Sequence, residues 1–305
     1  NVVVDTQMSR AIKILQMNNK MVVDERQRDL GNFLVGRLLP FRKKKSVGPF
    51  VFIDHMGPTE LSNGKFLDVD QHPHIGLCTL TYLYKGEIEH KDSTGSVQIV
   101  KPGGAGFMTS GKGVTHTERT PKSLRNKESQ LIHGYQIWVA LPLDLEESEP
   151  RFDYYPAQSL PQWEEKQLKY TLVAGEAFGK SSPLKGYSPM FMVSIEAKEE
   201  STIKLKDEVN GEVAIVVVEG EITEANEKVS AGQMLISKSD EACEICIPKG
   251  TKLLLFGGEA FLEERYLLWN FASSSKERLQ KARSDWENKL FPKVAGDETY
   301  IPIPV

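Results

Sequence analysis

The chain has 305 residues, a length comfortable for two domains of ordinary size. Its 38 Lys and Arg residues against 42 Asp and Glu residues give a formal net charge of −4, which argues against direct nucleic-acid binding through a basic surface. No apolar run approaches the roughly 20 residues that span a bilayer, so we expect no membrane partner. Three sparse cysteines are typical of a reducing compartment, and they predict a soluble, cytoplasmic protein.

Most of the chain consists of short strand-like segments separated by Gly, Pro, Asn and Asp. The pattern predicts strands at 50–53, 78–84, 97–100 and 137–141, and then at 169–173, 190–195, 214–218 and 252–256. A helix is predicted at 275–286, with Ser275 as its cap and Pro292 beyond its end. The mixed stretch 12–39 predicts no firm element. Frequent short strands are typical of all-β sandwiches and closed barrels.

Residues 142–170 interrupt this pattern with prolines among acidic and aromatic residues. The composition predicts a linker between an N-terminal domain, residues 1–141, and a C-terminal domain, residues 171–305, that carries the helix. The two halves also share a faint repeat, because Gly-Glu-Ile occurs at 86–88 and again at 220–222. Two copies of one β-unit would explain the length of the chain.

The histidines are confined to the first of these copies. They are His55, His72, His74, His90, His116 and His133. Aligning the two copies places Lys206 opposite His72 and Ile245 opposite His116, so the second copy lacks an equivalent set. If the protein binds a metal, the sequence therefore predicts one site, in the N-terminal domain.

Two pairs of candidate ligands share one spacing, His72 with His74 and His116 with Glu118. Residues two apart on a strand point to the same face, so a barrel that places both strands together would gather four ligands. Three imidazoles and a carboxylate suit Fe2+, Cu2+, Ni2+, Mn2+ or Zn2+, and the set contains no thiolate of the structural zinc type. A lone His-x-His is common, whereas two such pairs favour a metal site with positions left for water, substrate or O2.

Other motifs have plainer interpretations. His90, in a predicted hairpin turn, and His55, at a strand end, either lie beside the ligands or serve only the local backbone, and His133 is predicted to be structural. We interpret the Cys-x-x-Cys at 243–246 as packing, because residues three apart on a strand point to opposite faces. The basic run 42–45 is predicted to be a solvated loop that could meet an acidic partner.

Together these motifs resemble those of the pirins, a family of the cupin superfamily. The likeness covers nearly the whole chain and rests on segments 49–58, 72–77, 90–95, 115–118 and 136–139. It implies two cupin-type barrels (double-stranded β-helix, or jelly-roll) in one chain, with a short C-terminal helix and a tail that packs back on the other domain. It also implies one metal ion, usually iron as Fe2+, held by residues matching His72, His74, His116 and Glu118. Met56 stands where Phe is common in the family.

The resemblance leaves two functions open, because a fold does not settle a function. Some pirins resemble quercetin 2,3-dioxygenases, which open a flavonol with O2, and Glu118 would then be the general base. Other pirins regulate transcription factors or metabolic enzymes by contact and respond to the oxidation state of iron. We favour the dioxygenase, with a small aromatic substrate, over the metal-dependent redox sensor with a protein partner.

Overall fold

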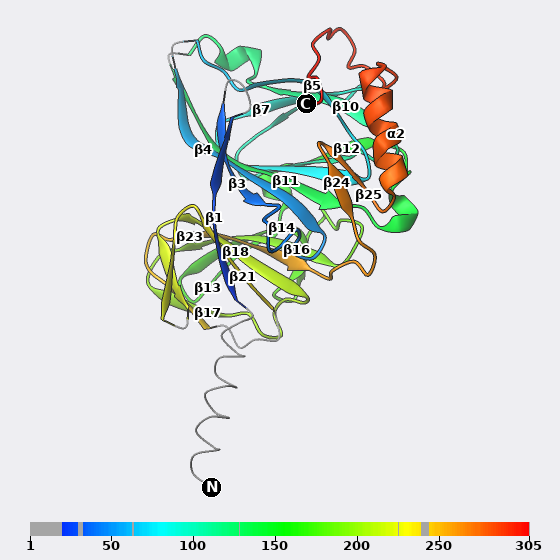
Figure 1. Ribbon diagram of the computed structural model, residues 1–305. Helices are drawn as coiled ribbons and strands as arrows, with labels where there is room; N and C mark the ends of the chain where they lie inside the picture. Colours follow the sequence, from blue (N-terminus) through cyan, green and yellow to red (C-terminus); the bar gives the residue numbers. More distant parts are fainter. Residues whose placement is uncertain are drawn as a thin grey trace.

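The computed structural model describes residues 20–29, 33–62, 64–127, 129–224, 226–238 and 244–304. Within these ranges the chain forms strands, three short 3-10 turns and the helix α2 (Lys276–Glu287). The strands build two stacked barrels (Figure 1). This confirms the predicted all-β class with two cupin-type barrels and a short C-terminal helix. No helix in the described ranges is long and apolar enough to cross a membrane, and Cys243 lies outside them.

The N-terminal barrel closes around two antiparallel sheets. Its strands are β2 (Arg26–Asp29), β3 (Leu34–Leu39), β4 (Phe50–Ser62), β5 (Asp68–His74), β6 (Leu77–Lys85), β7 (Ile88–Asp92), β8 (Val97–Val100), β9 (Ala105–Thr109), β10 (Val114–Arg119), β11 (Ser129–Ala140) and β12 (Arg151–Tyr155). The larger sheet has the order β12-β9-β6-β11-β4-β3-β2, and the smaller has the order β5-β10-β7-β8. The candidate ligands lie on neighbouring strands of the smaller sheet.

The C-terminal barrel repeats this plan. Its strands are β1 (Met21–Asp24), β13 (Gln162–Glu165), β14 (Leu168–Ala177), β15 (Lys180–Ser181), β16 (Met190–Ala197), β17 (Ser201–Lys204), β18 (Glu212–Glu219), β19 (Glu221–Glu224), β20 (Glu227–Ser230), β21 (Gln233–Lys238), β22 (Glu244–Ile247) and β23 (Lys252–Gly258). Its small sheet has the order β17-β22-β19-β20, which matches β5-β10-β7-β8 strand for strand. Gly86 and Gly220 adopt φ of +83° and +81° at equivalent turns, which supports the predicted repeat.

The two barrels share an apolar core where their large sheets face each other. Phe50 of β4 and Phe256 of β23 contact each other there, with ring centroids 5.0 Å apart. The segment 142–170 contributes one strand to each barrel, because β12 pairs with β9 of the N-terminal barrel and β13 pairs with β14 of the C-terminal barrel. Strand β1 precedes the N-terminal barrel in sequence and yet pairs with β21 of the other barrel.

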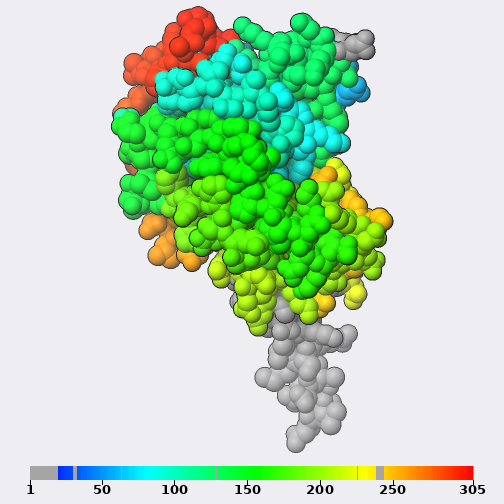
Figure 2. Space-filling model, turned by 180° about the vertical axis from the view of Figure 1, so that it is seen from behind, coloured from blue at the N-terminus to red at the C-terminus, as the bar shows by residue number. Residues whose placement is uncertain are grey.

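The C-terminal segment returns to the N-terminal barrel through the hairpin of β24 (Tyr266–Leu268) and β25 (Phe271–Ser273), followed by α2. Ser275 caps the helix as predicted, since its hydroxyl accepts a hydrogen bond from the Arg278 backbone N–H at 3.2 Å. The buried face of α2, which includes Trp286, packs with Phe271 and with Ile75 beside β5. Figures 1 and 2 show the C-terminal segment, in orange and red, against the cyan strands of the N-terminal barrel.

Candidate metal centre

Three imidazoles converge inside the N-terminal barrel. His72 and His74 lie on β5, and the antiparallel register places His116 of β10 directly opposite His72. One ligand atom from each ring lies within 4.8 Å of the other two, and His74 Nε2 is 3.1 Å from His116 Nε2. The structure therefore brings together the three histidines that the spacing indicated.

Backbone carbonyls orient two of these rings. His72 Nδ1 lies 2.7 Å from the Asp70 carbonyl oxygen, and His74 Nδ1 lies 3.1 Å from the carbonyl oxygen of Asn270. A carbonyl can only accept, so we assign the proton of each ring to Nδ1. Each Nε2 then keeps its lone pair and faces the shared space, which is the arrangement that a metal ligand requires.

His90 orients the third ring. Its Nε2 lies 2.8 Å from the Asp92 carboxylate, its ring stacks on Phe152, and its Nδ1 is 3.3 Å from His116 Nδ1. With Nε2 donating to Asp92, the Nδ1 of His90 accepts from His116, so that His116 also presents Nε2 to the cluster. The structure thus places His90 beside a candidate ligand. Of its two interpretations from the sequence, this agrees with the position next to the ligands rather than with a role in the local backbone alone.

The electrostatics of the cluster favour a bound cation. Burial lowers the pKa of His72 to about 4 and lowers the pKa values of His74 and His116 well below the ordinary range. All three rings are therefore neutral at neutral pH, the form that binds a metal. Two nitrogens 3.1 Å apart also match adjacent ligands on a metal at about 2.1 Å from each. The donor set fits a divalent transition metal.

Glu118 lies in the wall of the same cavity but outside the three-histidine group. The pairing of β10 with β5 shifts between His116 and Glu118, so the strand is irregular at this point. The carboxylate accepts a hydrogen bond from the Thr81 hydroxyl at 3.3 Å. Burial raises the pKa of Glu118 to about 7, an effect that hydrogen bonds from Thr81 and Gln136 oppose.

His72 and His74 line a cavity of about 440 Å³ with an aromatic wall. Phe52 and Trp138 stack with ring centroids 3.9 Å apart, and Trp138 meets His74 edge-on at 5.2 Å. Arg37 lies over the outer face of Phe52 and binds both oxygens of Asp54 at 2.8 Å. These rings give the cavity an aromatic wall next to the candidate ligands, suited to an aromatic molecule.

The C-terminal segment supplies part of this cavity, which sequence reasoning missed. Its lining includes Trp269, Asn270, Ile301 and Pro304. The side chain of Gln71, next to His72, anchors the tail by donating to the carbonyl oxygens of Asp297 and Thr299 at 2.9 and 3.0 Å and by accepting from the Val294 backbone N–H at 2.8 Å. The resemblance implied that the tail packs back on the other domain, but it did not imply that the tail lines the cavity.

His55 faces away from the cavity, which corrects its interpretation as a possible neighbour of the ligands. Asp54 and Met56 of β4 line the cavity, so the alternation of the strand turns His55 to the opposite face. There His55 Nδ1 lies 3.0 Å from the Glu25 carboxylate, and its Nε2 lies 3.1 Å from His133 Nε2. This buried pair belongs to the junction between the barrels.

The second barrel has apolar residues at the positions of the cluster. Ile203 of β17 pairs with Ile245 of β22, as His72 pairs with His116, and both isoleucines are buried. The register thus places Ile203, rather than Lys206, opposite His72. In the part of the chain that the structure describes, the three-histidine group is the one cluster of three or more His, Cys, Asp or Glu residues close enough to hold a metal.

Known proteins resemble the chain along nearly its whole length. Residues 32–139 match the Pirin family, and residues 190–292 match the Pirin C-terminal cupin domain. A pirin-like protein of Caulobacter vibrioides is 42% identical over 290 residues, which cover 93% of this chain and 99% of that protein.

Solved structures agree with this assignment. A crystal structure of quercetin 2,3-dioxygenase from Acinetobacter baumannii has a TM-score of 0.86 at 30% identity, with 94% of this chain and 95% of the other covered. The bacterial pirin YhhW from Escherichia coli, solved in complex with nickel(II), shares the fold with a TM-score of 0.59 at 21% identity, over 79% of this chain and all of that one. The two matched domains and the Caulobacter relative show that the chain belongs to the pirin family, within the cupin superfamily.

Proposed function

We propose that this pirin is a mononuclear metal-dependent dioxygenase that opens flavonols such as quercetin with O2. The observation that carries the proposal is the cluster of three neutral imidazoles at an aromatic-walled cavity. The similarity to the Acinetobacter dioxygenase over most of both chains supports the choice of chemistry. In this proposal His72, His74 and His116 hold the metal, and Glu118 completes the site.

The resemblance to the pirins favours Fe2+, and the donor set suits Cu2+, Ni2+, Mn2+ and Zn2+ as alternatives. Nickel(II) is the metal in the YhhW complex, which makes Ni2+ an alternative to test in this chain. When bound, the metal supplies a Lewis acid for a deprotonated flavonol hydroxyl and a position for O2.

Glu118 is the proposed general base. Its buried carboxylate lines the cavity, where it can take the proton of a flavonol 3-hydroxyl. The hydrogen bond from Thr81 holds one oxygen of the carboxylate in place. The Thr81 hydroxyl also lies within hydrogen-bond distance of the Gln136 side chain, which lines the cavity. The stacked pair of Phe52 and Trp138 would orient the planar rings of the substrate and exclude water from one face.

The test is turnover of quercetin in air by protein loaded separately with each of the five metals. Loss of the visible absorption of quercetin should accompany equimolar consumption of O2 with at least one metal. Replacing Glu118 by Gln should lower kcat by about 100-fold or more, because it removes the base, while the three histidines still retain metal. The metal content of the variant, measured by elemental analysis, separates loss of the base from loss of the metal.

A protein that binds one equivalent of metal and turns over no flavonol with any of the five ions would contradict the dioxygenase proposal. The metal-dependent binding protein that responds to the oxidation state of its iron would then be the better account of the same site.

A further inference from the structure

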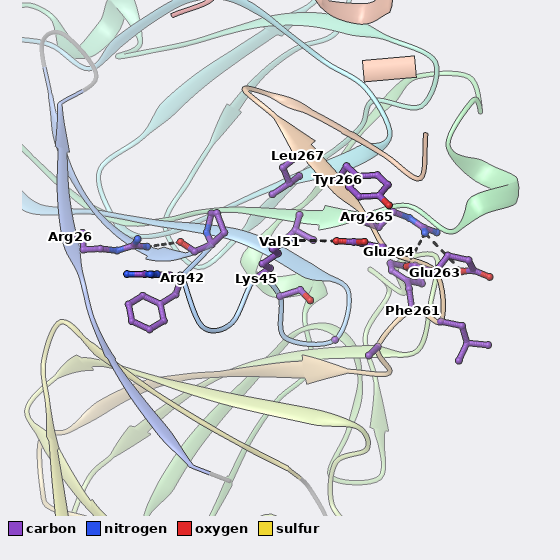
Figure 3. Close-up of a pocket in the computed structure, with 16 residues that line it drawn as sticks. Arg26, Arg42, Lys45, Val51, Phe261, Glu263, Glu264, Arg265, Tyr266 and Leu267 are labelled. Carbon is purple, nitrogen blue, oxygen red and sulfur yellow. Dashed lines mark hydrogen bonds and ion pairs between the residues drawn. The ribbon is translucent and has the colours of Figure 1, made fainter. Parts of the chain in front are cut away.

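A second cavity, of about 740 Å³, lies at the junction of the two barrels and shares no lining residue with the metal cavity. Figure 3 shows its two walls. One wall is the β3–β4 connection around residues 40–48, and the other is segment 260–267, which leads from β23 into β24. Neither the metal centre nor the proposed oxidation uses this cavity.

The first wall is a turn fixed by hydrogen bonds, and Arg42, Lys43 and Lys45 are exposed on it, as predicted for the solvated loop at 42–45. The backbone N–H groups of Phe41 and Lys44 donate to each other's carbonyl oxygens at 2.9 and 3.1 Å. Lys44 pairs with Glu212 of the C-terminal barrel, and the Gly48 N–H donates to the same carboxylate at 2.8 Å. The turn therefore presents its remaining side chains to the cavity in a preorganised arrangement.

Two guanidinium groups lie at one end of the cavity, and neither forms an ion pair with a carboxylate in the described part of the chain. Arg26 donates to the Pro40 carbonyl oxygen at 2.6 Å and lies over the Phe41 ring, while its Nε is buried without a hydrogen-bond partner. Arg42 is exposed and makes no ion pair with any residue that the structure describes. Figure 3 shows both side chains at the same end. Burial, followed by the charges of Arg28 and Arg37, lowers the pKa of Arg26, and the charge of Asp54 opposes this effect.

The opposite wall adds a buried cation and apolar surface. The Arg265 side chain is 4% exposed and binds Glu146 at 3.0 Å, while its Nη2 atom is buried without a hydrogen-bond partner. Phe261 covers the guanidinium of Arg265. Lys45 and Glu264 face each other across the cavity at 3.4 Å, in a pair that is too exposed to be strong.

The charge of the lining is opposite in sign to that of the whole chain. Four cations (Arg26, Arg42, Lys45 and Arg265) against two anions (Glu263 and Glu264) give the lining side chains a net charge of +2, whereas the chain carries −4. Guanidinium groups bind the oxygens of phosphate and carboxylate groups through paired N–H donors. The aromatic and aliphatic residues between the two walls suit an apolar body attached to such a group.

We propose that this cavity is a binding site for a small organic anion that carries a phosphate or carboxylate group on a planar apolar body. Arg26 and Arg42 receive the anionic group, and the apolar body lies toward Phe261 and Tyr266.

The test is calorimetric titration of the full chain with phenyl phosphate and, separately, with benzoate. Replacing Arg42 by Gln should weaken binding by about three- to tenfold, since it removes one charged donor. Replacing Glu264 by Gln should strengthen binding by about threefold, because it removes a repelling carboxylate and frees Lys45. The matched control is Lys43→Gln, which removes a charge from the same exposed turn but not from the cavity lining, and it should leave the affinity unchanged.

Tighter binding of phenyl phosphate would identify the group as a phosphate, and tighter binding of benzoate would identify a carboxylate. The proposal is overturned if neither anion binds, or if the Arg42 and Glu264 variants bind as tightly as the unmodified chain, because the anion would then occupy another site. Thermal unfolding of each variant verifies that it is folded, which is expected because the three replaced side chains are exposed.

Discussion

Each clustered imidazole has a partner behind it, and that partner determines which ring nitrogen remains for a metal. Asp70, Asn270 and His90 engage the Nδ1 atoms of the three rings, so the Nε2 atoms converge. Ligand geometry is therefore set by the surrounding chain before any metal arrives.

Replacing His74 by Ala should reduce bound metal by more than about tenfold, because His74 supplies one of three converging nitrogens. Elemental analysis of protein purified without added metal measures the effect. The matched control is His55→Ala, which removes a buried histidine on the other face of β4 and should keep the full metal content. Equal losses of metal in both variants would show that impaired folding, rather than loss of a ligand, accounts for the lower metal content.

The buried pair of His55 and His133 predicts a pH dependence of stability. Burial, and then the proximity of His55, lower the pKa of His133 to about 4, against an ordinary value of 6.5. Between these two pH values the unfolded chain binds a proton that the folded chain does not. The free energy of unfolding therefore falls as the pH decreases through this window, by about 1–3 kcal/mol from this residue.

Urea unfolding between pH 7 and pH 4 measures this effect, and His133→Asn provides the comparison. The variant should lose less stability on acidification than the unmodified chain, since it lacks one of the groups that protonate on unfolding. Contributions from His72, His74, His90 and His116, which do not contact His133, are common to both proteins and cancel. An identical pH slope in the two proteins would contradict the assignment to His133.

At the scale of secondary-structure elements, the β24–β25 hairpin positions a candidate ligand on β5. The Ala272 N–H donates to the Ile75 carbonyl oxygen at 3.1 Å, and the Asn270 carbonyl oxygen receives His74 Nδ1. Gly76 permits this approach, because its φ is +65° and an added Cβ would lie 2.0 Å from the Ala272 carbonyl oxygen. The hairpin can therefore pack this closely against the end of β5 only because residue 76 has no side chain.

Replacing Gly76 by Ala should displace the hairpin and weaken metal affinity by about 10- to 100-fold, through loss of the carbonyl that orients His74. Gly95→Ala is the control, because Gly95 also has positive φ, at +95°, but has nothing within 4 Å of the added Cβ. Both variants should lose about 1–2 kcal/mol of stability from backbone strain, and only Gly76→Ala should lose metal affinity. Competition with a chromophoric chelator measures the affinities.

Local periodicity explains which features the sequence could predict. The spacing of His72, His74 and His116 was informative because side chains alternate along a strand and two strands can pair directly. Alternation alone could not tell which face of β4 lines the cavity, so the direction of His55 stayed open. The contribution of Asn270 depends on a contact across about two hundred residues, and no local pattern records it.

At the scale of the whole molecule, the large sheets of the two barrels bury a common core, with Phe50 and Phe256 in contact. Replacing Phe256 by Ala should lower the free energy of unfolding by about 3–5 kcal/mol, because it leaves a cavity between the barrels. We expect one cooperative transition for both barrels, with equal calorimetric and van't Hoff enthalpies.

Leu290→Ala serves as the control, because Leu290 is 70% exposed and its loss should change the free energy of unfolding by less than about 0.5 kcal/mol. Two separate calorimetric transitions, or a Phe256→Ala variant as stable as the unmodified chain, would show that the barrels fold independently.

The return of the C-terminal segment to the first barrel has a consequence for biosynthesis. The ribosome makes the three clustered histidines early, but it adds Asn270 and Ile301 only after the entire second barrel has been translated. A nascent chain therefore carries an imidazole cluster with one ring unanchored and its cavity open to water. We therefore expect the ligand geometry to be completed only after translation of the second barrel, later than the segment that contains the ligands.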